Sequence, residues 1–350
     1  MAEIPIIDLS TKTLNPSSSS WVSACKYVQH ALEEYGFFLA RYDDFPSELD
    51  KQVFDVMEEL FDLPLETKTR NWGELAFHGY VGQLPHAPLH ESMGIPDATT
   101  SGAVEAFTTL MWHSGNNRFC ESISCYVKLV AELEQKVDKM VLESYGAAKH
   151  YESHVGSTTY LLRTLKYSAP DSNNNSSSNN IGANIHTDKN FLTIIHQNQV
   201  NGLEIQPRNG EWFAVEFPPA PGSFFVVMAG DSYQVLYYLP FNYYLILAYI
   251  FKFLLITRLY LNMWMRKGLE QWEDILSQAS SANERRQAQI LFGLVSLQHG
   301  ITHIPEELVD TEHPLQFKPF DSYGLLRFYL SRAPSDMSGS SAKEYCGVTA

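Results

Sequence analysis

The chain has 350 residues, of which 45% are hydrophobic and 19% charged, and its formal net charge is −15. This composition is typical of a globular protein and excludes a largely disordered one. A nucleic-acid surface needs clustered Lys and Arg, so the acidic balance argues against nucleic acid as a partner. The four cysteines show no paired spacing, and the first residues lack a basic, apolar leader. Both features predict a reducing, cytoplasmic location.

Helical and strand patterns alternate along the first 150 residues. Residues 4–9 and 36–40 are expected to form strands, the second of them buried. Apolar residues at helical spacing predict helices over 21–35, 51–61 and 120–145. Gly36 is expected to end the first of these helices, and the third carries the longest apolar stripe.

Residues 70–103 are rich in Gly, Pro and His, which predicts an irregular loop near a functional site. His78, Tyr80, His90 and Met93 lie in this segment and are candidates for the substrate entrance, with exposed loop positions as the alternative.

From Tyr160 onward, short strand patterns alternate with turn residues, and the polar tract 171–180 predicts a solvated loop. Helices followed by many short strands predict an α+β fold with a double-sheet jelly roll, also called a double-stranded β-helix. We expect a mixed N-terminal region over residues 1–150. The jelly roll should occupy residues 151–350, interrupted by an atypical apolar insert at 235–282.

A His-x-Asp motif is the most informative chemical feature of the chain. A β-branched and aromatic run follows His186-Thr187-Asp188, so the motif is expected to begin a strand. Alternate strand residues point the same way, which would place His186 beside Asp188. Such a pair supplies two of the three ligands of a facial triad for Fe(II). An isolated motif of this kind also occurs by chance, as a surface His near a solvated Asp.

Further motifs along the chain carry a resemblance to a known family. They include Ile4-Pro-Ile-Ile-Asp-Leu9, Tyr35-Gly-Phe-Phe38, Leu161-Leu-Arg-Thr-Leu-Lys-Tyr167, Asn283-Glu-Arg-Arg286, His313-Pro-Leu-Gln-Phe-Lys-Pro-Phe-Asp321 and Tyr345-Cys-Gly-Val348. With the His-x-Asp motif, they make the chain resemble the plant 2-oxoglutarate- and Fe(II)-dependent dioxygenases. The likeness is greatest to the AOP-type branch, which modifies glucosinolate side chains. It covers nearly the whole chain except roughly residues 235–282.

The resemblance implies Fe(II) as the metal, 2-oxoglutarate as cosubstrate and ascorbate as the expected reductant. It assigns His186 and Asp188 to the iron, with Lys189, Phe191 and Leu192 beside them. Arg286 is the candidate for the distal carboxylate of 2-oxoglutarate, because a planar guanidinium binds a carboxylate through two hydrogen bonds.

Several positions depart from the family pattern. The family follows its Arg with x-Ser, whereas this chain has Ala288, and the adjacent Arg285 is an alternative with a poorer register. Tyr167 matches the cosubstrate Tyr of the family's Asn-x-Tyr motif, although Leu165 replaces the Asn. A solvated strand charge at Arg286 and a core side chain at Tyr167 are the simpler interpretations.

The insert removes the segment in which the family carries its second iron-binding His. Residues 232–251 contain no charged side chain, and no His occurs between His196 and His299. A retained intron or a frame error is the preferred interpretation; a genuine insertion and a membrane segment are the alternatives. His299 and His303 are weak candidates for the missing ligand, and His196 lies too far along its strand to share the metal.

These observations predict a 2-oxoglutarate- and Fe(II)-dependent oxidation of a small plant metabolite or hormone by O₂. The reaction could be a hydroxylation, a desaturation or a side-chain oxidation. The alternative functions are a catalytically impaired, non-catalytic binding protein and a membrane-tethered protein. We expect a monomer without a nucleic-acid partner, and a membrane is not the expected partner.

Overall fold

The structure is a computed structural model of the whole chain, and a defined part of it is described below. The described residues are 4–16, 18–75, 77–84, 87–168, 186–198, 200, 202–207, 212–218, 224–236, 249–250, 288–309, 311, 314–332 and 341–348.

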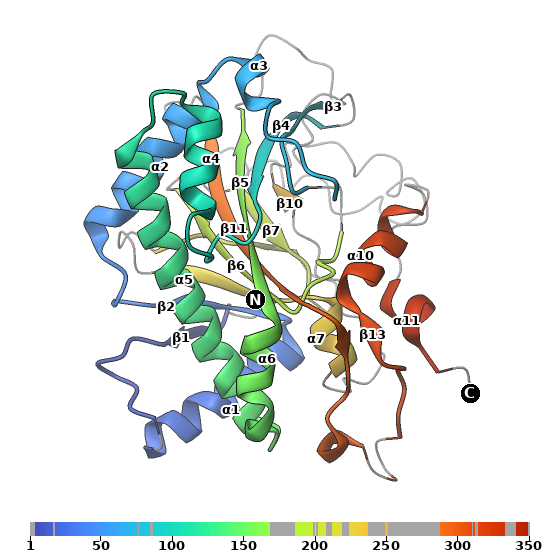
Figure 1. Ribbon diagram of the computed structural model, residues 1–350. Helices are drawn as coiled ribbons and strands as arrows, with labels where there is room; N and C mark the ends of the chain where they lie inside the picture. The colour runs from blue at the N-terminus through green and yellow to red at the C-terminus, as the bar shows by residue number, and fades with distance from the viewer. Residues whose placement is uncertain are drawn as a thin grey trace, which may run out of the picture.

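An eight-stranded mixed sheet forms the centre of the described structure (Figure 1). Its order is β1-β2-β9-β6-β11-β5-β4-β3, with β1 parallel to β2 and the other neighbours antiparallel. The strands are β1 Ile6–Asp8, β2 Phe37–Arg41, β3 Val81–Leu84, β4 Ala87–Ile95, β5 Thr158–Tyr167, β6 Leu192–Gln197, β9 Phe224–Ala229 and β11 Gln289–Gln298. Strands from before and after residue 150 therefore share one sheet, and the division into two regions stays a prediction.

Helices cover both sides of this sheet, with α1, α2, α4 and α5 on one side and α7, α10 and α11 on the other (Figure 1). The predicted helices over 21–35, 51–61 and 120–145 are confirmed with small changes of boundary. The helices are α1 Ser19–Glu34, α2 Ser47–Phe61, α3 Leu65–Lys68, α4 Ala103–Met111, α5 Asn117–Ser144, α6 Tyr151–Ser157, α7 Asp231–Leu236, α10 Ser322–Leu330 and α11 Ser341–Cys346, with 3-10 turns at Ala148–His150 and Glu306–Leu308. With the mixed sheet, they confirm the α+β class.

The prediction of an irregular loop over residues 70–103 is wrong for its middle part. Residues 81–84 and 87–95 form the hairpin of β3 and β4, and β4 pairs with β5. Gly94 explains part of the error, because a side chain there would meet two backbone carbonyl oxygens at 2.6 Å. The glycine marks a close backbone approach inside a strand rather than a loop.

A second, three-stranded sheet has the order β10-β7-β8, with β7 Leu203–Ile205, β8 Phe213–Ala214 and β10 Tyr249–Ile250. The side chain of Gln197 on β6 donates to the carbonyl of Val215, just after β8, at 3.1 Å. Gln289 on β11 donates in turn to Gln197 at 3.0 Å. These buried hydrogen bonds connect the two sheets. A short pair, β12 Ile301–Thr302 and β13 Phe320–Asp321, lies near the C-terminus.

The two faces of β5 have different neighbours. Tyr160 donates to Glu134 of α5 and Lys166 to Asp62 after α2, so the even-numbered residues face these helices. Arg163 and Tyr167 point to the opposite face, which we call the site face of β5. Directly opposed residues of antiparallel strands share a face, so Gln289, the partner of Tyr167, also lies on it.

Most of the expected insert at 235–282 lies outside the described residues. Its start, Val235, is buried against Phe317, Phe320 and Leu325 in a small cluster near the C-terminal helices. None of the helices in the described ranges is both long enough and apolar enough to cross a membrane.

Candidate active site

His186 and Asp188 lie close together, with His186 Nε2 3.6 Å from Asp188 Oδ1. The prediction that this motif begins a strand is wrong, since residues 186–189 have no regular structure and β6 begins at Leu192. The short segment nevertheless brings the imidazole and the carboxylate to one place. The proximity inferred from strand alternation therefore arises in an irregular segment before the strand.

Several hydrogen bonds hold the segment that carries these two side chains. Thr193 Oγ1 donates to Asp188 Oδ2 at 2.5 Å, which fixes the orientation of the carboxylate. The backbone N–H of Asp231, at the start of α7, donates to the carbonyl oxygen of Asp188 at 2.8 Å. Ser232 Oγ donates to the carbonyl oxygen of Lys189 at 2.8 Å. The beginning of α7 is thus bound to the candidate metal-binding segment.

A buried ion pair lies directly behind this segment. Lys189 Nζ is 2.8 Å from Asp231 Oδ2, and the two side chains are 3% and 2% exposed. The same ammonium lies 4.4 Å from the centre of the Tyr329 ring on α10. The pair connects the segment to α7, and the ring contact connects it to α10.

Tyr167 is buried on the site face at the end of β5, opposite His90 of β4 and Gln289 of β11. Its ring centre lies 5.2 Å from that of His90. Burial raises the pKa of the Tyr167 phenol, so the hydroxyl stays protonated and remains a hydrogen-bond donor. Arg285 and Arg286 lie outside the described residues, and Ala288 is the nearest described residue after them.

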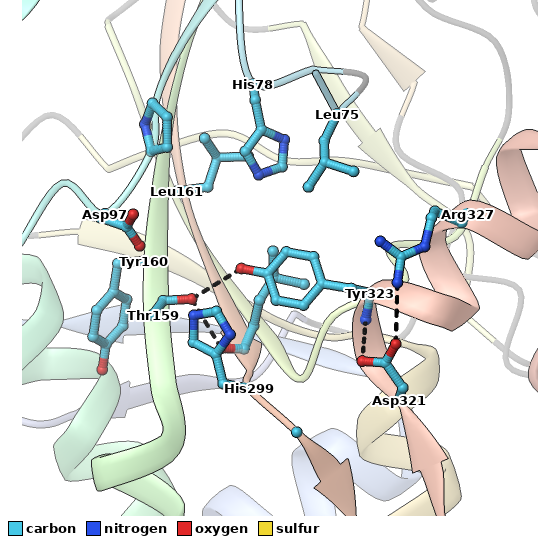
Figure 2. Close-up of a pocket in the computed structure, with 13 residues that line it drawn as sticks. Leu75, His78, Asp97, Thr159, Tyr160, Leu161, His299, Asp321, Tyr323 and Arg327 are labelled. Atoms are coloured by element: carbon cyan, nitrogen blue, oxygen red, sulfur yellow. Dashed lines mark hydrogen bonds and ion pairs between the residues drawn. The ribbon is translucent and has the colours of Figure 1, made fainter. Parts of the chain in front are cut away.

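A cavity of about 450 Å³ opens at the other end of β5 and β11. Figure 2 shows Tyr323 of α10 extending across it, with its hydroxyl 3.2 Å from Thr159 Oγ1. The His299 ring stacks on Tyr323 at 5.2 Å, and His78 lies on the opposite side of the cavity. Leu161 also lines it, so the cavity belongs to the same face as Tyr167. Of the four entrance candidates, His78 is the one that lines this cavity.

Comparison with known proteins identifies the family. The profile described as non-haem dioxygenase in morphine synthesis N-terminal matches residues 4–88, and that of the 2OG-Fe(II) oxygenase superfamily matches residues 157–243. The probable 2-oxoglutarate-dependent dioxygenase AOP1 of Arabidopsis thaliana is 36% identical over 95% of this chain and 98% of its own length. The chain belongs to the 2-oxoglutarate-dependent dioxygenases.

Two further dioxygenases are similar to this chain, one in its structure and one in its sequence. The rice dioxygenase for auxin oxidation superposes with a TM-score of 0.72, at 22% identity, over 98% of this chain and all of its own. This likeness confirms the expected jelly-roll fold. A probable inactive 2-oxoglutarate-dependent dioxygenase, AOP2 of Arabidopsis thaliana, is 27% identical over 99% of this chain and 98% of its own length.

Membership in this dioxygenase family implies Fe(II) and 2-oxoglutarate, and the donor atoms of His186 and Asp188 suit the metal. An imidazole nitrogen and a carboxylate oxygen are both accepted by Fe(II). Two ligands at about 2.1 Å from one ion and at right angles lie about 3 Å apart, close to the 3.6 Å observed. The residues therefore fit as two ligands of one ion.

A third protein ligand is missing from the part of the chain that the structure describes. No three His, Cys, Asp or Glu side chains in those ranges are grouped closely enough to hold a metal. His299 stacks on Tyr323, and His303 is exposed after β12. His196 lies on the helix-facing side of β6, with its Nε2 3.0 Å from Asp50 Oδ1 of α2.

Sequence reasoning missed the partners that position the site. No motif marks Thr193. Asp231 lies in Gly230-Asp-Ser232, which is a further motif of the family resemblance, but its role depends on contacts formed only in the fold. Arg163 did carry a signal, as a charged residue within an apolar strand run between Tyr160 and Leu165. It is buried on the site face and donates to Ser92 Oγ at 2.5 Å.

Proposed function

We propose that this protein catalyses the Fe(II)- and 2-oxoglutarate-dependent oxidation of a small organic molecule, a plant metabolite or hormone, by O₂. The observation that carries the proposal is the adjacent pair of His186 and Asp188, held by Thr193 in a chain of this family. Bound iron supplies activation of O₂ coupled to decarboxylation of 2-oxoglutarate, giving succinate and CO₂.

The protein's own side chains have separate roles in this proposal. His186 and Asp188 hold the metal, and Thr193 keeps the Asp188 carboxylate turned toward it. The Tyr167 hydroxyl donates a hydrogen bond to 2-oxoglutarate, and Arg286 pairs with the distal carboxylate of that molecule. Phe191 and Leu192 are buried directly after this segment, and the Phe191 ring packs against His154 of α6.

A second candidate function is a binding protein with little or no catalysis. It is favoured by the absence of any His between His196 and His299 and of a three-ligand group in the described ranges. The relative named as probably inactive gives a precedent within the family. We expect this chain to turn over 2-oxoglutarate poorly, because metal affinity depends on ligand number. In either case we propose a cytoplasmic monomer, with ascorbate as reductant for an active form.

The test is an anaerobic Fe(II) titration of the full chain, followed by succinate formation from 2-oxoglutarate. His186→Ala and Asp188→Ala should each abolish iron binding, whereas His299→Ala, the matched control, should bind as the wild type does. Iron binding that survives in both site variants would remove this site.

Replacing residues 235–282 by a short His-containing segment of the family should restore succinate formation. Equal turnover by the original and the repaired chain would instead show that another side chain completes the iron site.

A further inference from the structure

The segment that carries the two candidate iron ligands forms two pairs of alternate side chains. His186 and Asp188 make one pair, with 3.6 Å between Nε2 and Oδ1. Thr187 and Lys189 make the other, in which Lys189 Nζ donates to Thr187 Oγ1. The side chains of His186 and Asp188 are 38% and 22% exposed, whereas that of Lys189 is 3% exposed. The second pair, which we call the rear pair, is therefore directed into the protein, away from the accessible ligands.

The rear pair is anchored to two helices that lie on one side of the large sheet (Figure 1). Lys189 Nζ is 2.8 Å from Asp231 Oδ2 of α7 and 4.4 Å from the centre of the Tyr329 ring of α10. An ammonium has three N–H groups that point in different directions, so it suits partners on separate elements. Lys189 thus connects Thr187 to α7 and α10.

Thr187 is the residue whose displacement would move both ligands, because it lies between them in the chain. Its Cα is about 3.8 Å from the Cα of His186 and from that of Asp188. Thr193 fixes the Asp188 carboxylate alone, through Oγ1 at 2.5 Å. The hydrogen bond from Lys189 to Thr187 acts instead on the backbone that carries both ligands.

Order in this segment has a direct effect on metal affinity. Binding an ion to a loose segment costs the conformational entropy of the residues that must be fixed. A segment that is already held in the bound arrangement loses less, so it binds more tightly. This contribution matters most where few protein ligands are available, as in the described part of this site.

We propose that Thr187 and Lys189 are positioning residues of the iron site, whose hydrogen bond holds His186 and Asp188 at the separation that one Fe(II) ion requires. The rear pair acts through the two ligands and supplies no ligand atom itself. This inference rests on the proposed function, since it concerns the metal on which that function depends. The alternative is that the rear pair stabilises the fold and leaves metal affinity unchanged.

The test compares Thr187→Val, which removes the hydroxyl and keeps the shape, with Thr187→Ser, which keeps the hydroxyl. Fe(II) is titrated anaerobically into the full chain, under conditions in which circular dichroism shows every variant to be folded. Thr187→Val should weaken Fe(II) binding about tenfold or more, whereas Thr187→Ser should stay within about twofold of the wild type. The absorption spectrum of bound Co(II), which reports ligand geometry, should change in Thr187→Val and not in Thr187→Ser.

Thr108→Val is the matched control, because it removes another buried threonine hydroxyl, one that donates to the Val104 carbonyl within α4 at 2.7 Å. It should bind Fe(II) as the wild type does. Equal weakening in Thr108→Val and Thr187→Val would show a general effect of hydroxyl loss and would overturn the inference.

A second comparison separates positioning from stability. Lys189→Met combined with Asp231→Leu should be more stable than Lys189→Met alone. Both should nevertheless bind Fe(II) equally weakly, because neither retains the hydrogen bond to Thr187. The inference is overturned if Thr187→Val binds Fe(II) as the wild type does, if Thr187→Ser is as weak as Thr187→Val, or if affinity recovers with stability in the double variant. Absence of Fe(II) binding in the wild type would refute the proposed function and this inference with it.

Discussion

Replacing Lys189 by Met should destabilise the protein by about 4 kcal/mol. The Lys189–Asp231 pair is nearly inaccessible, and its charges lie 2.8 Å apart. At an effective dielectric constant of about 20, this separation corresponds to an attraction of about 6 kcal/mol, before desolvation is subtracted. Removing one partner of a buried ion pair typically costs about 3–5 kcal/mol. Loss of the ammonium above the Tyr329 ring adds about 0.5–1 kcal/mol.

Urea unfolding at pH 7 would measure this cost, with Lys189→Met, Asp231→Leu and the double variant compared. The double variant should be more stable than either single one, because it removes both charges of the buried pair. Arg118→Ala, which breaks ion pairs between half-exposed side chains, is the control and should cost less than about 1 kcal/mol. A cost below about 1 kcal/mol for Lys189→Met, or additive costs in the double variant, would refute the reasoning.

Three further predictions concern other parts of the structure. Burial, then the charge of Asp138, raises the pKa of Glu134, so the folded state keeps the Glu134 proton to higher pH than the unfolded chain. The free energy of unfolding should therefore fall as pH rises above the unfolded pKa of about 4.3, by at most about 1.4 kcal/mol per pH unit. Measured by urea unfolding from pH 4 to 8, this dependence on pH should be weaker in Glu134→Gln. Equal dependence in the wild type and the variant would contradict the prediction. Gly94→Ala should lower the stability measured by thermal unfolding by about 1–3 kcal/mol, because the new Cβ would overlap backbone oxygens. Gly156→Ala is the control and should cause no loss, because a Cβ there meets open space. Similar losses at both sites would show that packing is not the cause. Thr193→Val should weaken Fe(II) binding about 10- to 100-fold in an anaerobic titration, and unchanged affinity would exclude it as a positioning residue.

Local sequence patterns predicted the elements that depend on local interactions. The apolar stripe of α5 follows from helical periodicity. The chain leaves α1 at Gly36, because glycine readily adopts a positive φ, here 77°. The proximity of His186 and Asp188 was also predicted, although an irregular segment rather than a strand brings it about. Three residues of chain cannot separate two such donors widely in either conformation.

Contacts between distant segments could not be predicted from the same patterns. Asp231 reaches Lys189 and Asp188 only because β9 lies beside β6 in the sheet. The hairpin of β3 and β4 was missed because β5 supplies its pairing partner from far along the chain. Arg163 could be recognised as unusual within its apolar run. Its acceptors, however, are visible only in the fold.

The strand order has a consequence for how the chain folds during synthesis. β11 lies between β6 and β5, yet it is the last strand of the large sheet to be made. Until residues 289–298 have emerged, β5 and β6 each present an unpaired inner edge to the surrounding solution, to chaperones and to other nascent chains. Such long-range pairing is slow, because the chain loses the entropy of a large loop before the contacts between the strands can form. The time needed to synthesise the long segment between β9 and β11 therefore determines how long the edges of β5 and β6 remain unpaired. During that time the incomplete sheet is exposed to aggregation.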